Sequence, residues 1–214
     1  QARARSSMAA YLAGHPNDAY ICSKLGGSYV SAEDYDRAVA LLKRGLALSP
    51  KEPAIAYELH FHLGLAYRQQ QQWQLADEHY QQAIAQAVLP AVKLGAFVNW
   101  GALRLSGGDP AGAQATFERA IAIAPDFAIA HFNLGMALKS QKLWLEAIAA
   151  YERAIAIDPD YAAARRNLGV VWMKLGIVPK SLEAFRGAIA IYDRQGSTEG
   201  ERLRRSLAGM GFKV

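Results

Sequence analysis

The stretch AIAHFNLGMALKSQKLWLEAIAAYERAIAIDPDY, residues 128–161, carries the pattern that decides the fold. Its apolar residues recur at helical spacing in two runs, separated by a polar turn near Lys142. The same skeleton returns 34 residues earlier and 34 residues later, so that Gly135 is matched by Gly101 and Gly169. A fixed period of this length predicts stacked helical hairpins, none of which can bury its apolar face alone.

Five copies of this unit follow one another along the chain. Glycine occupies the eighth position of every copy, and a large apolar or aromatic residue occupies the twenty-fourth. Because glycine inside a helix costs about 1 kcal/mol against alanine, its return in register indicates a demand of packing. The glycines are Gly26, Gly64, Gly101, Gly135 and Gly169, and the large residues are Leu42, Tyr80, Phe117, Tyr151 and Phe185.

This pattern resembles the tetratricopeptide repeat (TPR) family. The resemblance implies an all-α fold, the TPR right-handed superhelix, which is an α-α solenoid of antiparallel helical hairpins. It implies a single domain over residues 1–214. Residues 1–16 are expected to form either a partial repeat, as in a fragment of a longer chain, or a capping helix. The expected repeats are 19–52, 57–93, 94–127, 128–161 and 162–195, and residues 196–214 are expected to form a capping helix with a tail.

Two repeats are longer than the period because of short insertions. Each insertion contains a proline, Pro53 or Pro90, at a position that suits the first residue of a helix lengthened by about one turn. A disordered loop is the alternative. At the C-terminal end, Ser197 can cap a last helix on which Leu203, Leu207 and Met210 form one apolar stripe.

Composition excludes several classes of protein. The chain is 52% hydrophobic by count, which is ample for a core and unlike a disordered chain. No run of about 18 uncharged apolar residues occurs, so no membrane-spanning helix is expected. Cys22 is the single cysteine, which excludes an internal disulfide and a thiolate zinc cluster. We expect a cytoplasmic protein, with a membrane-associated full-length protein as the alternative.

The positive charge gathers towards the C-terminal end. Net charge is +5, and residues 162–214 alone hold ten Lys/Arg against four Asp/Glu. Such an end suits an acidic protein or an anionic lipid surface, or it is simply a solvated face.

Catalytic and metal-binding motifs are missing from the sequence. No nucleotide loop, paired cysteines, HExxH or GxSxG motif occurs. His60 and His62 lie two residues apart on an expected helix, so their rings point to different sides and do not bind one ion. We therefore expect no enzymatic activity, no metal and no cofactor.

The resemblance also implies a binding site. In TPR proteins the first helices line a concave groove, and the matching positions here give an apolar floor beside a row of asparagines. Each asparagine presents a donor and an acceptor to a peptide backbone. The row resembles the asparagine ladder of the O-GlcNAc transferase TPR domain, although asparagine is also the commonest family residue there. The candidate residues are Phe61, His62, Leu65, Val98, Asn99, Ala102, Phe132, Asn133, Met136, Arg166, Asn167 and Val170.

A cationic clamp for chaperone tails is not expected. Chaperone-binding TPR proteins hold a C-terminal carboxylate with Lys, Arg and Asn at fixed positions. Those positions hold Ser23, Gly27, His62, Gly95 and Asn99 in one register, and Phe61, Leu65, Asn99, Ile129 and Asn133 in the next.

These observations favour a non-enzymatic scaffold or adaptor that binds a peptide or an amphipathic helix in the groove. Resemblance to TPR proteins of photosynthetic bacteria, several of which assist assembly of membrane complexes, suggests a role in complex assembly. Two alternatives stay open: a targeting module of a larger, transferase-type enzyme, and self-association through the groove. The groove could also be covered by an N-terminal segment. Nucleic acid is not an expected partner, since no docking motif accompanies the basic end.

Overall fold

The computed structural model describes residues 2–86 and 88–212, which form helices joined by short turns. The chain divides into two compact units, Gln1–Gly108 and Asp109–Val214. The first unit contains α1 (Ala2–Gly14), α2 (Ala19–Val30), α3 (Tyr35–Ala47), α4 (Pro53–Gln69), α5 (Trp73–Ala85), the 3₁₀ helix η1 (Pro90–Lys93) and α6 (Leu94–Ser106). The second contains α7 (Pro110–Ile123), α8 (Ala128–Ser140), α9 (Trp144–Ile157), α10 (Ala162–Lys174), α11 (Val178–Arg194) and α12 (Glu199–Gly209).

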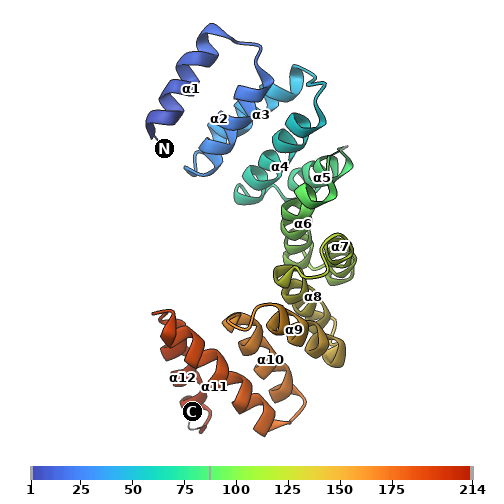
Figure 1. The fold of residues 1–214 in the computed structure, drawn as a ribbon, viewed down its shortest axis with the longest axis vertical. Coiled ribbons are helices and arrows are strands. Elements are labelled where there is room, and N and C mark those ends of the chain that lie inside the picture. Colours follow the sequence, from blue (N-terminus) through green and yellow to red (C-terminus); the bar gives the residue numbers. More distant parts are fainter. Residues whose placement is uncertain (1, 87, 213–214) are drawn as a thin grey trace. The chain divides into compact units, whose positions relative to one another are not determined.

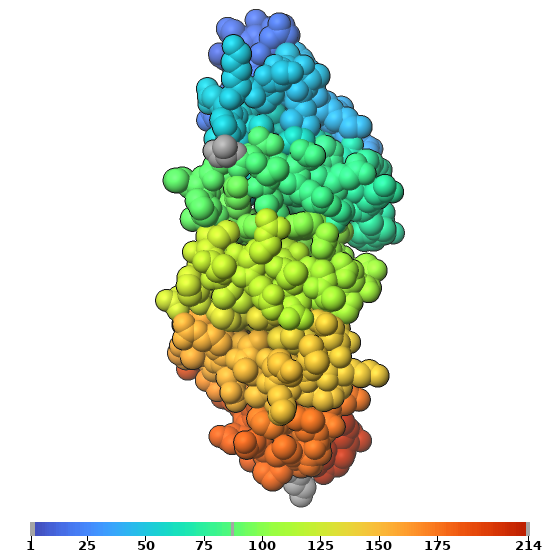
Figure 2. Space-filling model, turned by 90° about the vertical axis from the view of Figure 1, so that its right-hand side faces the viewer, coloured from blue at the N-terminus to red at the C-terminus, as the bar shows by residue number. Residues whose placement is uncertain are grey.

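Within each unit, consecutive helices pack as antiparallel hairpins (Figure 1). The hairpins are α2 with α3 and α4 with α5 in the first unit, and α8 with α9 and α10 with α11 in the second. First helices of neighbouring hairpins also touch, α2 with α4 and α8 with α10, and so form an inner layer in each unit. Colours change in chain order along the surface of each unit (Figure 2), because each hairpin packs mainly on its neighbours in sequence. The all-α helical repeat fold predicted from the period is confirmed.

The glycine at the eighth position of a repeat lies against the large side chain of the second helix. A Cβ on Gly135 would lie 2.6 Å from the Tyr151 ring, and one on Gly169 would lie 2.7 Å from the Phe185 ring. The first unit repeats this arrangement, with Gly64 against Tyr80 and Gly26 against Leu42. Tyr80, Tyr151 and Leu42 are fully buried. The glycine therefore lets the two helices of a hairpin approach until the large residue fills the space between them.

The two insertions, at Pro53 and at Pro90, form different kinds of helix. α4 begins at Pro53, one turn before Tyr57, as the sequence predicts. Pro90 instead begins the 3₁₀ helix η1, which leads directly into α6 at Leu94. The lengthened α-helix expected there is replaced by a tighter turn, because a proline start suits both helix types. The Tyr57 hydroxyl donates a hydrogen bond to the Val92 carbonyl at 2.7 Å and ties α4 to this turn.

The last helix, α12, covers the end of the second unit. Leu203 and Leu207 are buried against α11. The Ser197 hydroxyl accepts a hydrogen bond from the backbone N–H of Glu199 at 3.3 Å. The expectation for Met210 was wrong: it is 54% exposed, because α12 ends at Gly209 and the helical spacing stops before it.

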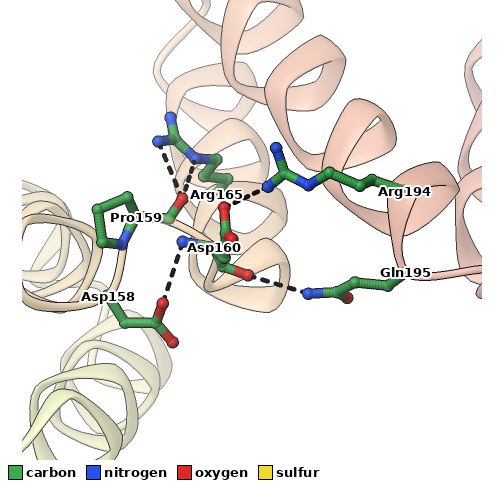
Figure 3. A network of polar contacts seen from close by, with 6 residues as sticks. All are labelled: Asp158, Pro159, Asp160, Arg165, Arg194 and Gln195. Atoms are coloured by element: carbon green, nitrogen blue, oxygen red, sulfur yellow. Dashed lines mark hydrogen bonds and ion pairs between the residues drawn. The ribbon is translucent and has the colours of Figure 1, made fainter.

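Polar contacts join the turn between α9 and α10 to the end of α11 (Figure 3). Arg194 forms an ion pair with Asp160, and the Gln195 amide donates to the Asp160 carbonyl at 3.4 Å. Arg165 donates to the Pro159 carbonyl at 3.2 Å from the first turn of α10. The carbonyls of this turn are therefore satisfied by side chains of the following hairpin.

Two histidines form a half-buried contact between α4 and α5. The Nδ1 atoms of His60 and His79 lie 2.9 Å apart, and the Tyr67 ring stacks on His79. Burial lowers the pKa of His79 from its ordinary 6.5 to about 4, with smaller contributions from His60 and Lys43. Burial also lowers the pKa of His60. One Nδ1 must donate and the other accept, so the contact between α4 and α5 requires at least one neutral imidazole.

We predict that Gly135→Ala lowers the free energy of unfolding by about 1–3 kcal/mol, because the new methyl group overlaps the fixed Tyr151 ring. Gly209→Ala is the matched control, since a Cβ there meets nothing within 4 Å and α12 gains helix propensity. Urea unfolding followed by circular dichroism measures both. Equal stability of the two variants would contradict the packing role of Gly135.

We also predict a loss of stability on mild acidification. The unfolded chain takes up a proton at His79 near pH 6.5, whereas the folded chain does so only near pH 4. Protons therefore bind the unfolded state preferentially, and the free energy of unfolding falls as pH is lowered through this window. Denaturant titrations at several pH values should show a shallower fall for His79→Gln. If the free energy of unfolding depended on pH identically in wild type and variant, His79 would not be the source of the pH dependence.

Candidate functional site

The candidate residues of the first unit lie on α4 and α6. Phe61 stacks on Tyr57 with ring centroids 5.8 Å apart, and its ring lies against Gly95 of α6, where a Cβ would make an ordinary contact at 3.6 Å. The sequence predicted an open apolar floor, but the structure half-buries these side chains against their neighbours. The candidate residues placed here are Phe61, His62, Leu65, Val98, Asn99 and Ala102.

A carboxylate in the first unit is held between two hairpins. Lys24 of α2 donates to both oxygens of Glu58 at 2.6 and 2.8 Å, and the buried Ser23 hydroxyl donates at 2.7 Å. Burial raises the pKa of Glu58, but these bonds and the Lys24 charge outweigh it and hold the pKa below 4.5.

His62 lies beside this network, above Gly27. A Cβ on Gly27 would lie 2.7 Å from the His62 ring, so glycine provides the space in which the imidazole is packed. Burial lowers the pKa of His62, and the nearby Glu58 charge opposes that effect. His62 is thus a neutral packing residue beside the ion pair.

The candidate residues of the second unit lie on α8 and α10. Phe132 packs on Tyr161 and Tyr151, with ring centroids 4.9 and 6.0 Å apart, and is half-buried. Met136 also packs on this core, and Val170 packs on the core beneath α12. Here too the floor is less open than the sequence predicted, because the large side chains turn into the core. The residues placed here are Phe132, Asn133, Met136, Arg166, Asn167 and Val170, of which Arg166 is exposed.

The three asparagines share one local geometry. Each side-chain amide donates to the carbonyl four residues earlier: Asn99 to Gly95 at 2.8 Å, Asn133 to Ile129 and Asn167 to Ala163 at 2.9 Å. This bond fixes the amide and aims its oxygen away from its own helix.

In each unit, a cationic side chain from the preceding hairpin donates a hydrogen bond to the side-chain oxygen of one of these asparagines. Arg68 of α4 donates to Asn99 at 3.0 Å, and Lys139 of α8 donates to Asn167 at 2.7 Å. Within the described chain, no hydrogen bond reaches the oxygen of Asn133. These two cations are not among the candidate residues predicted from the sequence. Arg68 and Lys139 both occupy the twelfth position of their repeats, one repeat before an asparagine, and this recurrence was the signal that the sequence offered.

Ile129 is an exposed residue of this face that sequence reasoning left out. It is 44% exposed on α8, at helical spacing from Phe132, Asn133 and Met136. The inner face of α8 therefore offers an exposed apolar side chain next to an amide whose oxygen accepts no hydrogen bond from the described residues.

The described residues lack two further kinds of feature, a metal-binding cluster and a membrane-spanning helix. Residues 2–86 and 88–212 contain no group of three His, Cys, Asp or Glu placed to hold a metal ion. None of the helices described is long and apolar enough to span a membrane.

Comparison with known families decides the class of protein. The tetratricopeptide repeat model matches residues 23–88, 98–162 and 144–195, which together exceed half of the chain. The chain belongs to the tetratricopeptide repeat family. TPR proteins are generally non-catalytic interaction scaffolds, and this chain shares their hairpin repeat.

Two curated relatives match part of this TPR chain. A TPR repeat-containing protein of Synechococcus elongatus is 42% identical over 123 residues, which cover 58% of this chain and 30% of the relative. The human protein O-mannosyl-transferase TMTC1 is 30% identical over 118 residues, covering 55% of this chain and 13% of the enzyme. The matched segment is thus less than a third of either relative.

Solved TPR structures share the fold at low sequence identity. MamA residues 41 to the end, from Desulfovibrio magneticus RS-1, superposes with a TM-score of 0.72 and 20% identity, covering 84% of this chain and 97% of that one. YrrB, described as a TPR protein with an unusual peptide-binding site, gives 0.68 and 21%, covering 86% and 91%.

We predict that Lys24→Met lowers the free energy of unfolding at pH 7 by about 0.5–1 kcal/mol, a small effect because the ion pair is partly exposed and screened. The depressed pKa of Glu58 stabilises the fold above pH 4.5 and less as pH falls below it, so the difference should shrink in acid. Lys51→Met, an exposed lysine, is the charge-matched control. A difference in the free energy of unfolding between wild type and Lys24→Met that does not change with pH would contradict a stabilising role of the Glu58 carboxylate.

Proposed function

We propose that this TPR chain is a non-enzymatic scaffold that binds an extended peptide or an amphipathic helix along the inner layer of first helices. One observation carries the proposal: the face of α8 presents Ile129, 44% exposed, beside Asn133, whose amide is fixed and whose oxygen accepts no hydrogen bond from the described residues. An apolar contact next to an oriented amide suits a peptide side chain and its backbone N–H.

The half-buried apolar residues of the groove floor support this role as a rigid surface and not as a fully exposed patch. Phe132 and Met136 are packed on the core, so they form a firm surface that needs little rearrangement on binding. The same holds for Phe61 in the first unit, which lies between Tyr57 and Gly95. The peptide-binding site of YrrB, a protein of similar fold, is consistent with such a use of the hairpin repeat.

We propose that this peptide binding serves the assembly of a protein complex. A scaffold with separate binding faces in two units can hold one segment with each of them.

A second candidate function is that of a targeting module in a larger transferase. The match to TMTC1 favours it, because a segment of that enzyme aligns with more than half of this chain. The native reading frame and the mass of the native protein test this alternative. A native protein without a transferase domain would exclude it.

We predict that a photo-crosslinking residue at Ile129 yields adducts with a protein from native lysate, because Ile129 lies on the proposed binding face. The matched control is the same residue at Leu145 of α9, which is 70% exposed on the second helix of the hairpin. Asn133→Ala should reduce the Ile129 adducts at unchanged melting temperature. Adducts equal at both positions, or only with a second copy of the chain, would overturn peptide binding on this face.

A further inference from the structure

Two cations meet on the inner layer of the second unit. Lys139 of α8 donates to the Asn167 oxygen at 2.7 Å, and Arg166, the residue before Asn167 on α10, lies close enough for its charge to act on Lys139. Burial first, and then the charge of Arg166, lower the pKa of Lys139. Arg166 is exposed, and its charge also acts on the Tyr192 side chain of α11. Lys139 is held by a neutral group, the Asn167 amide.

Among the described residues, no carboxylate forms an ion pair with either cation of this pair. α8 and α10 carry no Asp or Glu at all. On the neighbouring helices, Asp193 is bound to Arg204 and Glu199 is bound to Arg202. No ion pair joins Lys139 or Arg166 to an acidic side chain in the part of the chain that the structure describes.

In the inner layer of the first unit, the positive charge is balanced by a carboxylate. There Lys24 of α2 meets Glu58 of α4, and the carboxylate receives two bonds from the ammonium group and one from Ser23. The Asn167 oxygen replaces part of the hydration that half-buried Lys139 loses, but no opposite charge offsets the like charge of Arg166, so the arrangement in the second unit is costly in the absence of an anion. A carboxylate between Lys139 and Arg166 would remove that cost.

We propose that Lys139 and Arg166 form the anchor for an acidic side chain of the bound segment, so that the partner of this scaffold is a peptide carrying Asp or Glu next to apolar residues. This inference rests on the proposed function and adds the chemistry of the partner. The apolar requirement comes from Ile129 and Met136, which lie on the same helix as Lys139. The fixed Asn167 amide holds the ammonium group in place for the incoming carboxylate.

The test uses a displayed library of random short peptides, selected on the whole chain. Selected peptides should be enriched in Asp and Glu. Their affinity should fall about tenfold or more in the variant Lys139→Gln/Arg166→Gln, since charge-assisted hydrogen bonds are lost. The control variant Lys142→Gln/Arg205→Gln removes the same charge from exposed positions, and should bind within about twofold of wild type. Glutamine suits position 142, because Gln71 has the same left-handed backbone in an earlier turn.

A charge reversal sharpens the test. Selection on Arg166→Glu should abolish the acidic enrichment, because the new carboxylate would pair with Lys139 as Glu58 pairs with Lys24 in the first unit. Removal of the like-charge contact in Lys139→Gln should leave the melting temperature unchanged or raise it, which separates lost binding from lost folding.

Four outcomes would overturn the inference. Selected peptides without acidic enrichment, or peptides that bind Lys139→Gln/Arg166→Gln as tightly as wild type, would do so while peptide binding itself stands. Displacement of the peptides by inorganic phosphate at far lower concentration than by acetate would identify a phosphate site instead. No selected peptide at all would overturn the proposed function, and this inference with it.

Discussion

The contact between a glycine on the first helix and a large side chain on the second sets the spacing within each hairpin. In the second unit the missing Cβ of Gly135 makes room for Tyr151, and Gly169 makes room for Phe185. Because the interior is packed at nearly crystalline density, even one methyl group at these positions must displace a ring. The spacing so fixed brings α8 beside α10, and with them the side chains of the inner layer.

The inner layers of the two units share one arrangement of side chains but differ in their charge balance. An asparagine is fixed by its own helix, and a cation from the preceding hairpin binds its oxygen, as Arg68 does for Asn99 and Lys139 for Asn167. The first unit also holds the internal pair of Lys24 and Glu58. In the second unit no acid occurs on α8 or α10, so positive charge stays unbalanced. The two units thus offer different surfaces on one scaffold.

Much of the fold could be predicted because its determinants are local and repeated. α2, α6, α8 and α10 begin at Ala19, Leu94, Ala128 and Ala162, where the sequence period begins. The turns were less predictable. Glu33, Gln71 and Lys142 adopt positive φ at the same repeat position as Gly108 and Gly176. Side chains at such positions are strained by about 1 kcal/mol, so only the two glycines gave a signal in the sequence.

By itself, the sequence determined the helical period, the hairpin repeat and the residues that face the inner layer, because these depend on spacing along one helix. Tertiary structure decided what those residues do. Phe132 turns into the core between Tyr151 and Tyr161, whereas Ile129 stays exposed, although both are apolar residues of one helix face. Tertiary structure also placed Lys139 against Asn167, 28 positions away. Such contacts depend on how neighbouring hairpins pack, and the distance between two helices is not encoded in the spacing along either one.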